Sequence, residues 1–114
     1  MYKINLRPLI LFILISLFLL GGCSKYSDEV QANLIKLKKT KSCSGCDLTG
    51  IELISFDLKG ADLSGANLTG ANLRRSDLTG ANLTDTNLTD ADLLGVNLTG
   101  ATLINTNLTG VKLS

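Results

Sequence analysis

Apolar residues along the chain follow three different patterns. Residues 9–20 are apolar with a single exception. Between residues 30 and 37, apolar residues recur at the spacing that lines up on one face of an α-helix. From residue 46 onward the period becomes five, with Leu at every fifth position through residue 113. The chain therefore divides into an apolar segment, an amphipathic segment and a long periodic segment.

The amphipathic segment predicts an α-helix over about residues 27–40. Ser27 is a favourable N-cap, and the acidic residues that follow it suit the positive end of the helix dipole. Val30, Leu34 and Leu37 form the apolar stripe. Four lysines gather at the other end, at positions 36, 38, 39 and 41. We expect this helix to cover the start of the periodic segment. Attraction of its lysines to anionic lipid is the alternative.

A period of five matches neither an amphipathic helix nor a flat strand. Asp, Asn or Glu precedes the Leu in twelve of fourteen units, a small or apolar residue stands two before it, and Gly usually stands two after it. This pattern fits a coil that turns a corner every five residues, so that four units close a square of 20 residues. We expect Leu and the residue two before it to point inward, and the other three positions to face water.

The units resemble those of the pentapeptide-repeat family, as in ADLSG at 61–65, ANLTG at 66–70 and ANLTD at 81–85. The resemblance covers 69 of the 114 residues. It implies an all-β solenoid, namely a right-handed quadrilateral β-helix of about 3.5 coils, here with a short N-terminal capping α-helix. The family indicates little about function, because the scaffold serves many roles.

The first residues indicate a lipoprotein leader. Two basic residues, an apolar core and small residues at its exit are typical of a secretory signal peptide. Leu20-Gly21-Gly22-Cys23 resembles the lipobox of bacterial lipoproteins, in which cleavage precedes the Cys and lipid is attached to it. Gly at the second box position departs from the usual Ala or Ser. An uncleaved signal anchor is the alternative, although 12 apolar residues are few for a span of roughly 20.

These features predict three regions and a location. Residues 1–22 are the signal peptide, 23–42 the tether and amphipathic capping helix, and 43–114 the pentapeptide-repeat β-helix. Several acyl chains on Cys23 would hold the protein stably at a membrane. We expect an exported protein, lipid-anchored in the bacterial cell envelope. Because Ser24 rather than Asp follows Cys23, the resemblance favours the outer membrane facing the periplasm if the cell is Gram-negative.

Cys43 and Cys46 form a C-x-x-C spacing with three interpretations. A thiol-redox site needs a helix N-terminus, whereas these residues follow a helix C-terminus. A zinc site needs about four ligands, and the chain has no His. The third interpretation is structural, because pentapeptide proteins that begin with a helix and a Cys-x-x-Cys-Asp-Leu junction resemble this segment. A disulfide and two buried thiols both fit that resemblance.

Residues 20 apart should stack, which defines a candidate interaction face. One side presents Ile54, Arg74 and Leu94, with Arg75 beside Arg74, where other sides show mostly Thr, Ser or Lys. Sequence drift on a tolerant scaffold is the alternative explanation. The final coil ends in mid-pattern, and we predict that this C-terminal end is either a homodimer interface or a frayed edge.

Composition weighs against catalysis and nucleic-acid binding. The net charge of +1 is small, and carboxylates such as Asp62 and Asp77 occupy a repeated outward position rather than forming a pair. We expect no enzyme activity, cofactor, metal or bound nucleic acid, and an unknown protein partner. The leading hypothesis is a membrane-tethered scaffold or protein-interaction module. Its main rival is a DNA-mimic inhibitor of a topoisomerase, since some family members inhibit DNA gyrase through an acidic surface. The repeat carries eight acids against four bases, a modest net charge of −4, and export would separate the protein from gyrase.

Overall fold

The computed structural model describes residues 25–114. The predicted signal peptide and Cys23 lie outside the described residues, so their predictions stay untested by the structure. Within the described part of the chain, no helix has both the length and the apolar character needed to cross a membrane.

The amphipathic segment forms helix α2, which spans Asp28–Thr40. The Ser27 hydroxyl oxygen accepts a hydrogen bond from the Val30 N–H at 3.3 Å, as an N-cap does. At the other end Lys41 takes the left-handed conformation, and its N–H donates to the Leu37 carbonyl at 2.8 Å. The predicted helix and its N-cap are therefore confirmed, with bounds shifted by one residue at the start.

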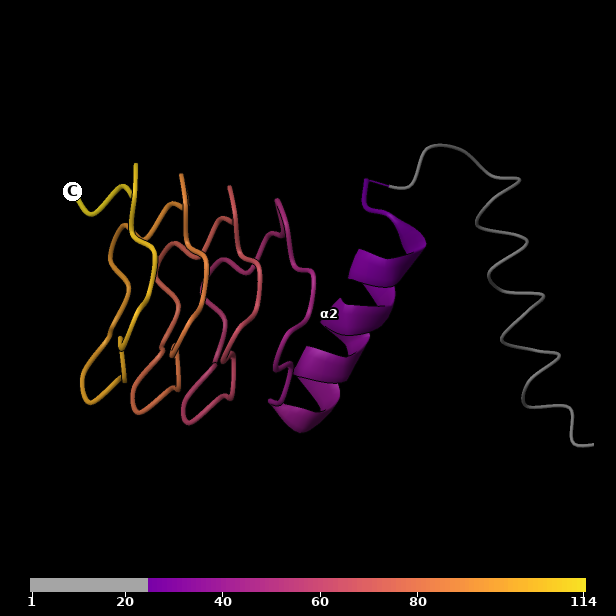
Figure 1. Ribbon diagram of the computed structural model, residues 1–114, viewed down its shortest axis with the longest axis horizontal. Helices are drawn as coiled ribbons and strands as arrows, with labels where there is room; N and C mark the ends of the chain where they lie inside the picture. Colours follow the sequence, from indigo (N-terminus) through magenta and orange to yellow (C-terminus); the bar gives the residue numbers. More distant parts are fainter. Residues whose placement is uncertain (1–24) are drawn as a thin grey trace, which may run out of the picture.

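The periodic segment forms a column of stacked coils, and α2 lies across one end of it (Figure 1). Single parallel bridges join Ser42, and then each residue before a Leu, to the residue 20 positions later, from Ser42 and Asp62 to Asp92 and Lys112. An offset of 20 residues corresponds to four units of five per coil. The stack thus begins at Ser42, one residue before the predicted boundary.

Backbone hydrogen bonds tie each coil to the coils on both sides. The N–H of Leu68 donates forward to the Asn87 carbonyl at 2.7 Å, and the N–H of Asn67 donates back to the Cys46 carbonyl at 2.9 Å. The N–H of Ala66 donates to the Leu63 carbonyl at 3.0 Å and closes the corner between two units. Buried backbone groups are satisfied in this way without long strands.

The polar residues of the repeat build the corners. In the unit 66–70, the Asn67 side-chain oxygen accepts hydrogen bonds from the Thr69 N–H at 3.0 Å and the Thr69 hydroxyl at 2.6 Å. Gly70 follows with φ of +66°, a backbone conformation that costs glycine little. The same conformation is taken by non-glycine residues at five repeat positions: Ser55, Arg75, Asp85, Asp90 and Asn105. Gly is therefore favoured at this position but is not required.

The leucines fill the inside of the column, as the period predicts. The exposed fraction of their side chains is 2 % or less at Leu48, Leu53, Leu58, Leu63, Leu68, Leu73, Leu78, Leu83, Leu88 and Leu93. Val30 and Leu37 of α2 belong to the same buried cluster. Three leucines of the last coil are instead exposed, Leu103 by 40 %, Leu108 by 44 % and Leu113 by 66 %, because no further coil covers them among the described residues.

Two polar residues take inward positions that usually hold Ala. Ser76 and Thr86 are each 1 % exposed. The Ser76 hydroxyl donates to the Leu53 carbonyl, and the Thr86 hydroxyl donates to the Leu63 carbonyl at 2.7 Å. Among residues 25–114, no buried side-chain nitrogen or oxygen lacks a hydrogen-bond partner. The hydroxyls therefore add a bond to the preceding coil at little cost in desolvation.

Candidate interaction surfaces

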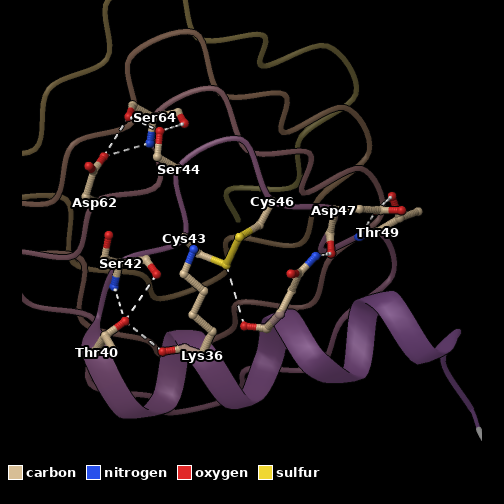
Figure 2. The surroundings of a disulfide bond; sticks show 11 residues. Lys36, Thr40, Ser42, Cys43, Ser44, Cys46, Asp47, Thr49, Asp62 and Ser64 are labelled. Atoms are coloured by element: carbon tan, nitrogen blue, oxygen red, sulfur yellow. Dashed lines mark hydrogen bonds between the residues drawn. A yellow bond between two sulfur atoms is a disulfide. The ribbon is translucent and has the colours of Figure 1, made fainter.

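Cys43 and Cys46 are joined by a disulfide where α2 meets the first coil (Figure 2). Both residues are buried, with exposed fractions of 0 % and 7 %. The Cys43 N–H donates to the Asp62 carbonyl at 2.8 Å, which places Cys43 within the hydrogen bonding of the stack. Of the two structural alternatives that the sequence left open, the structure has the disulfide rather than two buried thiols.

Asn33 of α2 contacts the junction in two ways. Its side-chain amide donates to the Asp47 carbonyl at 3.0 Å. Its carbonyl oxygen lies 3.5 Å from the Cys43 sulfur. Because a disulfide sulfur carries no proton, this is a contact and not a hydrogen bond. The junction therefore holds α2 against the first coil, and the sulfurs lie under the helix rather than at its N-terminus.

The candidate face of Ile54, Arg74, Arg75 and Leu94 is brought together by the stacking, and we call it the Ile54–Leu94 face. The Ser55 N–H donates to the Arg74 carbonyl, and the Arg75 N–H donates to the Leu94 carbonyl, at 2.8 and 2.9 Å. Ile54 is 50 % exposed, while Leu94 is partly buried. The Arg74 guanidinium lies 3.9 Å from an Asp92 carboxylate oxygen, and both side chains contact water. The face thus presents two apolar residues with Arg74 in the coil between them and Arg75 beside Arg74.

The C-terminal end is the most apolar exposed surface of the described coils. Besides its three exposed leucines, Ile104 is 60 % exposed. The end also presents backbone groups of the last coil that have no coil beyond them among residues 25–114. Nothing in the structure tests whether a second copy covers this end, so the homodimer stays a prediction.

Carboxylates of the coils accept hydrogen bonds that stabilise the corners. The Ser64 and Thr79 hydroxyls donate to Asp62 and Asp77, and these bonds hold the pKa of each carboxyl below its usual range. The Thr49 hydroxyl lowers the pKa of Asp47 in the same way. Among residues 25–114, no cluster of three or more His, Cys, Asp and Glu side chains could hold a metal ion. These carboxylates are repeat elements bound to their own corners.

The fold is a four-sided solenoid of five-residue units, which defines the class of protein. The family model described as pentapeptide repeats, in 8 copies, matches residues 42–80 and 76–114. The chain belongs to the pentapeptide-repeat family, whose members form right-handed quadrilateral β-helices. The β-helix fold that the resemblance implied is thereby confirmed, while the number of coils stays a prediction.

Solved structures of the same family resemble the chain. A pentapeptide repeat protein of Nostoc Pcc 7120 is 42 % identical, with 73 % of this chain and 74 % of that chain covered and a TM-score of 0.46. A pentapeptide repeat protein of the Arabidopsis thaliana thylakoid lumen is 29 % identical, with coverages of 81 % and 73 % and a TM-score of 0.52.

HetL, a Nostoc pentapeptide repeat protein involved in heterocyst differentiation regulation, is 33 % identical, with a TM-score of 0.40. The match covers 61 % of this chain but only 37 % of the HetL chain. A search of curated proteins finds no match.

Proposed function

We propose that this protein is a membrane-tethered pentapeptide-repeat lipoprotein that acts as a non-catalytic scaffold or protein-interaction module in the cell envelope. The observation that carries the proposal is the order of its parts: a sequence that resembles a lipobox ends at Cys23, five residues before α2, and α2 is packed on a column. A lipid anchor attached to such a column of about 3.5 coils holds its outer faces at a membrane surface. The proposed location is the envelope, on the outer membrane facing the periplasm in a Gram-negative cell.

The tether is tested by palmitate labelling of cells that produce the full chain. Label on the mature protein is expected, and Cys23→Ser is expected to abolish both the label and cleavage of residues 1–22. Cys43 and Cys46 do not compete for label, because they are bonded to each other. A full chain that carries no lipid and stays in the cytoplasm would contradict the tether.

For the partner, the Ile54–Leu94 face is the proposed docking surface. Its two apolar residues, with Arg74 between them and Arg75 alongside, fit a partner surface that offers apolar side chains and carboxylates in alternation. Affinity capture from envelope fractions is expected to lose that partner in the double variant Ile54→Thr and Leu94→Thr. Lys59→Thr is the control, because it changes an exposed side chain that belongs neither to this face nor to the C-terminal end. Equal capture by both variants would remove the face from the proposal.

A DNA mimic that inhibits a topoisomerase is the second candidate. It is favoured by the excess of acids over bases in the coils, eight against four. Inhibition of DNA supercoiling by the purified protein, together with cytoplasmic location of the full chain, would support this candidate over the envelope scaffold.

A thiol-redox function requires reductase activity that disappears in Cys43→Ser, and the burial of both sulfurs disfavours it.

A further inference from the structure

Charge is divided along the axis on which the coils stack. Residues 25–41 carry five lysines and two acids, a net charge of +3. The coils from residue 42 onward carry eight acids and four bases, a net charge of −4. Because α2 lies across one end of the column (Figure 1), the described part of the protein has one positive end and a negative body. Such a charge distribution orients a protein in the field of a charged surface.

The positive end has an outward face of mixed character. Val30 and Leu37 are buried against the coils, whereas Ile35 is 64 % exposed. Lys36 and Lys39 are exposed as well. We call Ile35, Lys36 and Lys39 the Lys36–Lys39 face. A helix surface that combines cations with an exposed aliphatic side chain is the kind that lies in a membrane interface.

The remaining lysines of this region are already engaged. Lys25 pairs with Glu52, and the Lys41 ammonium lies 3.3 Å from an Asp57 carboxylate oxygen. The Lys38 ammonium lies 5.6 Å from the centre of the Phe56 ring. Lys36 and Lys39 form no ion pair with any other residue of 25–114, so their charges are free to meet an external anion.

We infer that the Lys36–Lys39 face docks on the anionic phospholipid headgroups of the membrane, so that the column stands with α2 toward the bilayer and its exposed leucine end away from it. The inference rests on the proposed tether in one respect: acyl chains on Cys23 hold the bilayer within about 18 Å of Asp28, the reach of five extended residues. Lipid is favoured over an acidic protein because that anchor supplies the anionic surface at a fixed short distance.

A fluorophore on α2 reports the docking in the full lipoprotein. Ala32→Cys provides the only free thiol once Cys23 is acylated, and residue 32 is exposed on α2. The labelled protein is reconstituted into vesicles of phosphatidylglycerol and phosphatidylcholine, or of phosphatidylcholine alone, each with a headgroup-level quencher lipid. Strong quenching is expected only on the anionic vesicles, and 1 M salt is expected to remove it, because the Debye length falls to about 3 Å. The same label at Thr99→Cys, on the coils, is expected to stay unquenched.

Two charge variants make the test specific. Each lysine at the surface favours the docked state about fivefold, so Lys36→Gln with Lys39→Gln is expected to lower the docked-to-undocked ratio about 25-fold. Lys59→Gln with Lys112→Gln removes the same charge from the coils and is expected to leave the quenching unchanged. Equal quenching on anionic and neutral vesicles would overturn the inference. An equal decrease of quenching in the two double variants would overturn it as well. The acylation of Cys23 is read by mass spectrometry in the same sample, so that loss of the tether and loss of docking are distinguished.

Discussion

Replacing one inward leucine in the middle of the column tests how the core is built. Leu68→Ala removes a side chain with no exposed surface, between Leu48 and Leu88 on the same side of the stack. Leu108→Ala removes the same atoms from the last coil of that side, where 44 % of the side chain is already exposed. The two variants share their repeat position and differ chiefly in burial.

The expected costs follow from that difference. A fully buried Leu→Ala change loses the transfer free energy and leaves a cavity, which together cost about 2–5 kcal/mol. The coils above and below Leu68 are held in register by hydrogen bonds, so we expect little collapse around the cavity and a loss of about 4 kcal/mol. Leu108 is nearly half in contact with water and leaves no closed cavity, so its loss is expected to be about 1 kcal/mol.

Urea unfolding followed by far-UV circular dichroism measures both losses. Because a solenoid is stabilised mainly by neighbouring coils, the transition of each variant is first checked for a single cooperative step. An equal loss of unfolding free energy in the two variants would refute the difference in burial from which the expected values are derived. A Leu68→Ala variant as stable as the parent would refute the inward placement itself.

Three further predictions concern charge, the junction and assembly. Hydroxyl hydrogen bonds hold the pKa of the corner carboxyls below that of an unfolded chain. The unfolded state therefore binds more protons once the pH falls below about 4, and the free energy of unfolding decreases as the pH falls further. Acid titration of unfolding is expected to show a weaker decrease, with little change at pH 7, when Asn replaces Asp47, Asp62 and Asp77; an unchanged acid profile would contradict this. Reduction of the disulfide should add two hydrogens by mass and lower stability by about 2 kcal/mol, the chain entropy of so short a loop, and unaltered stability would contradict the estimate. Light scattering of the unlipidated mature domain separates the two predictions for the C-terminal end: a dimer that Leu113→Glu separates would support an interface at the exposed leucines, whereas a monomer at all concentrations would remove the interface and support the frayed edge.

The fold could be predicted because each repeat position has a local cause. Leu is buried in the interior, and Gly adopts a positive φ at little cost. The Asn67 side-chain oxygen accepts a hydrogen bond from the Thr69 N–H within the same corner. Those causes act within five residues, so the sequence pattern displays them directly. The helix could be predicted for the same reason, since Ser27 and the apolar stripe are local signals.

Features that depend on the neighbouring coil were harder to predict. The hydroxyls of Ser76 and Thr86 bond carbonyls 23 residues earlier, and only the stacked coils show that these carbonyls lie within reach. Either a disulfide or two thiols fits the spacing of Cys43 and Cys46, because both would be buried small groups beneath α2. Similarly, the sequence alone did not separate Lys36 and Lys39 from the lysines that have partners.

Amide hydrogen exchange followed residue by residue tests the central claim most directly, namely that five-residue units stack with an offset of 20. The N–H groups of Leu68, Leu73, Leu78 and Leu83 donate to the next coil and are expected to exchange slowly. Among residues 25–114, those of Leu98, Leu103 and Leu108 have no carbonyl partner and are expected to exchange fast. A protection pattern that repeats every five residues and fades in the last coil agrees with the account. Uniform exchange across residues 46–114, or a helical period, would contradict it.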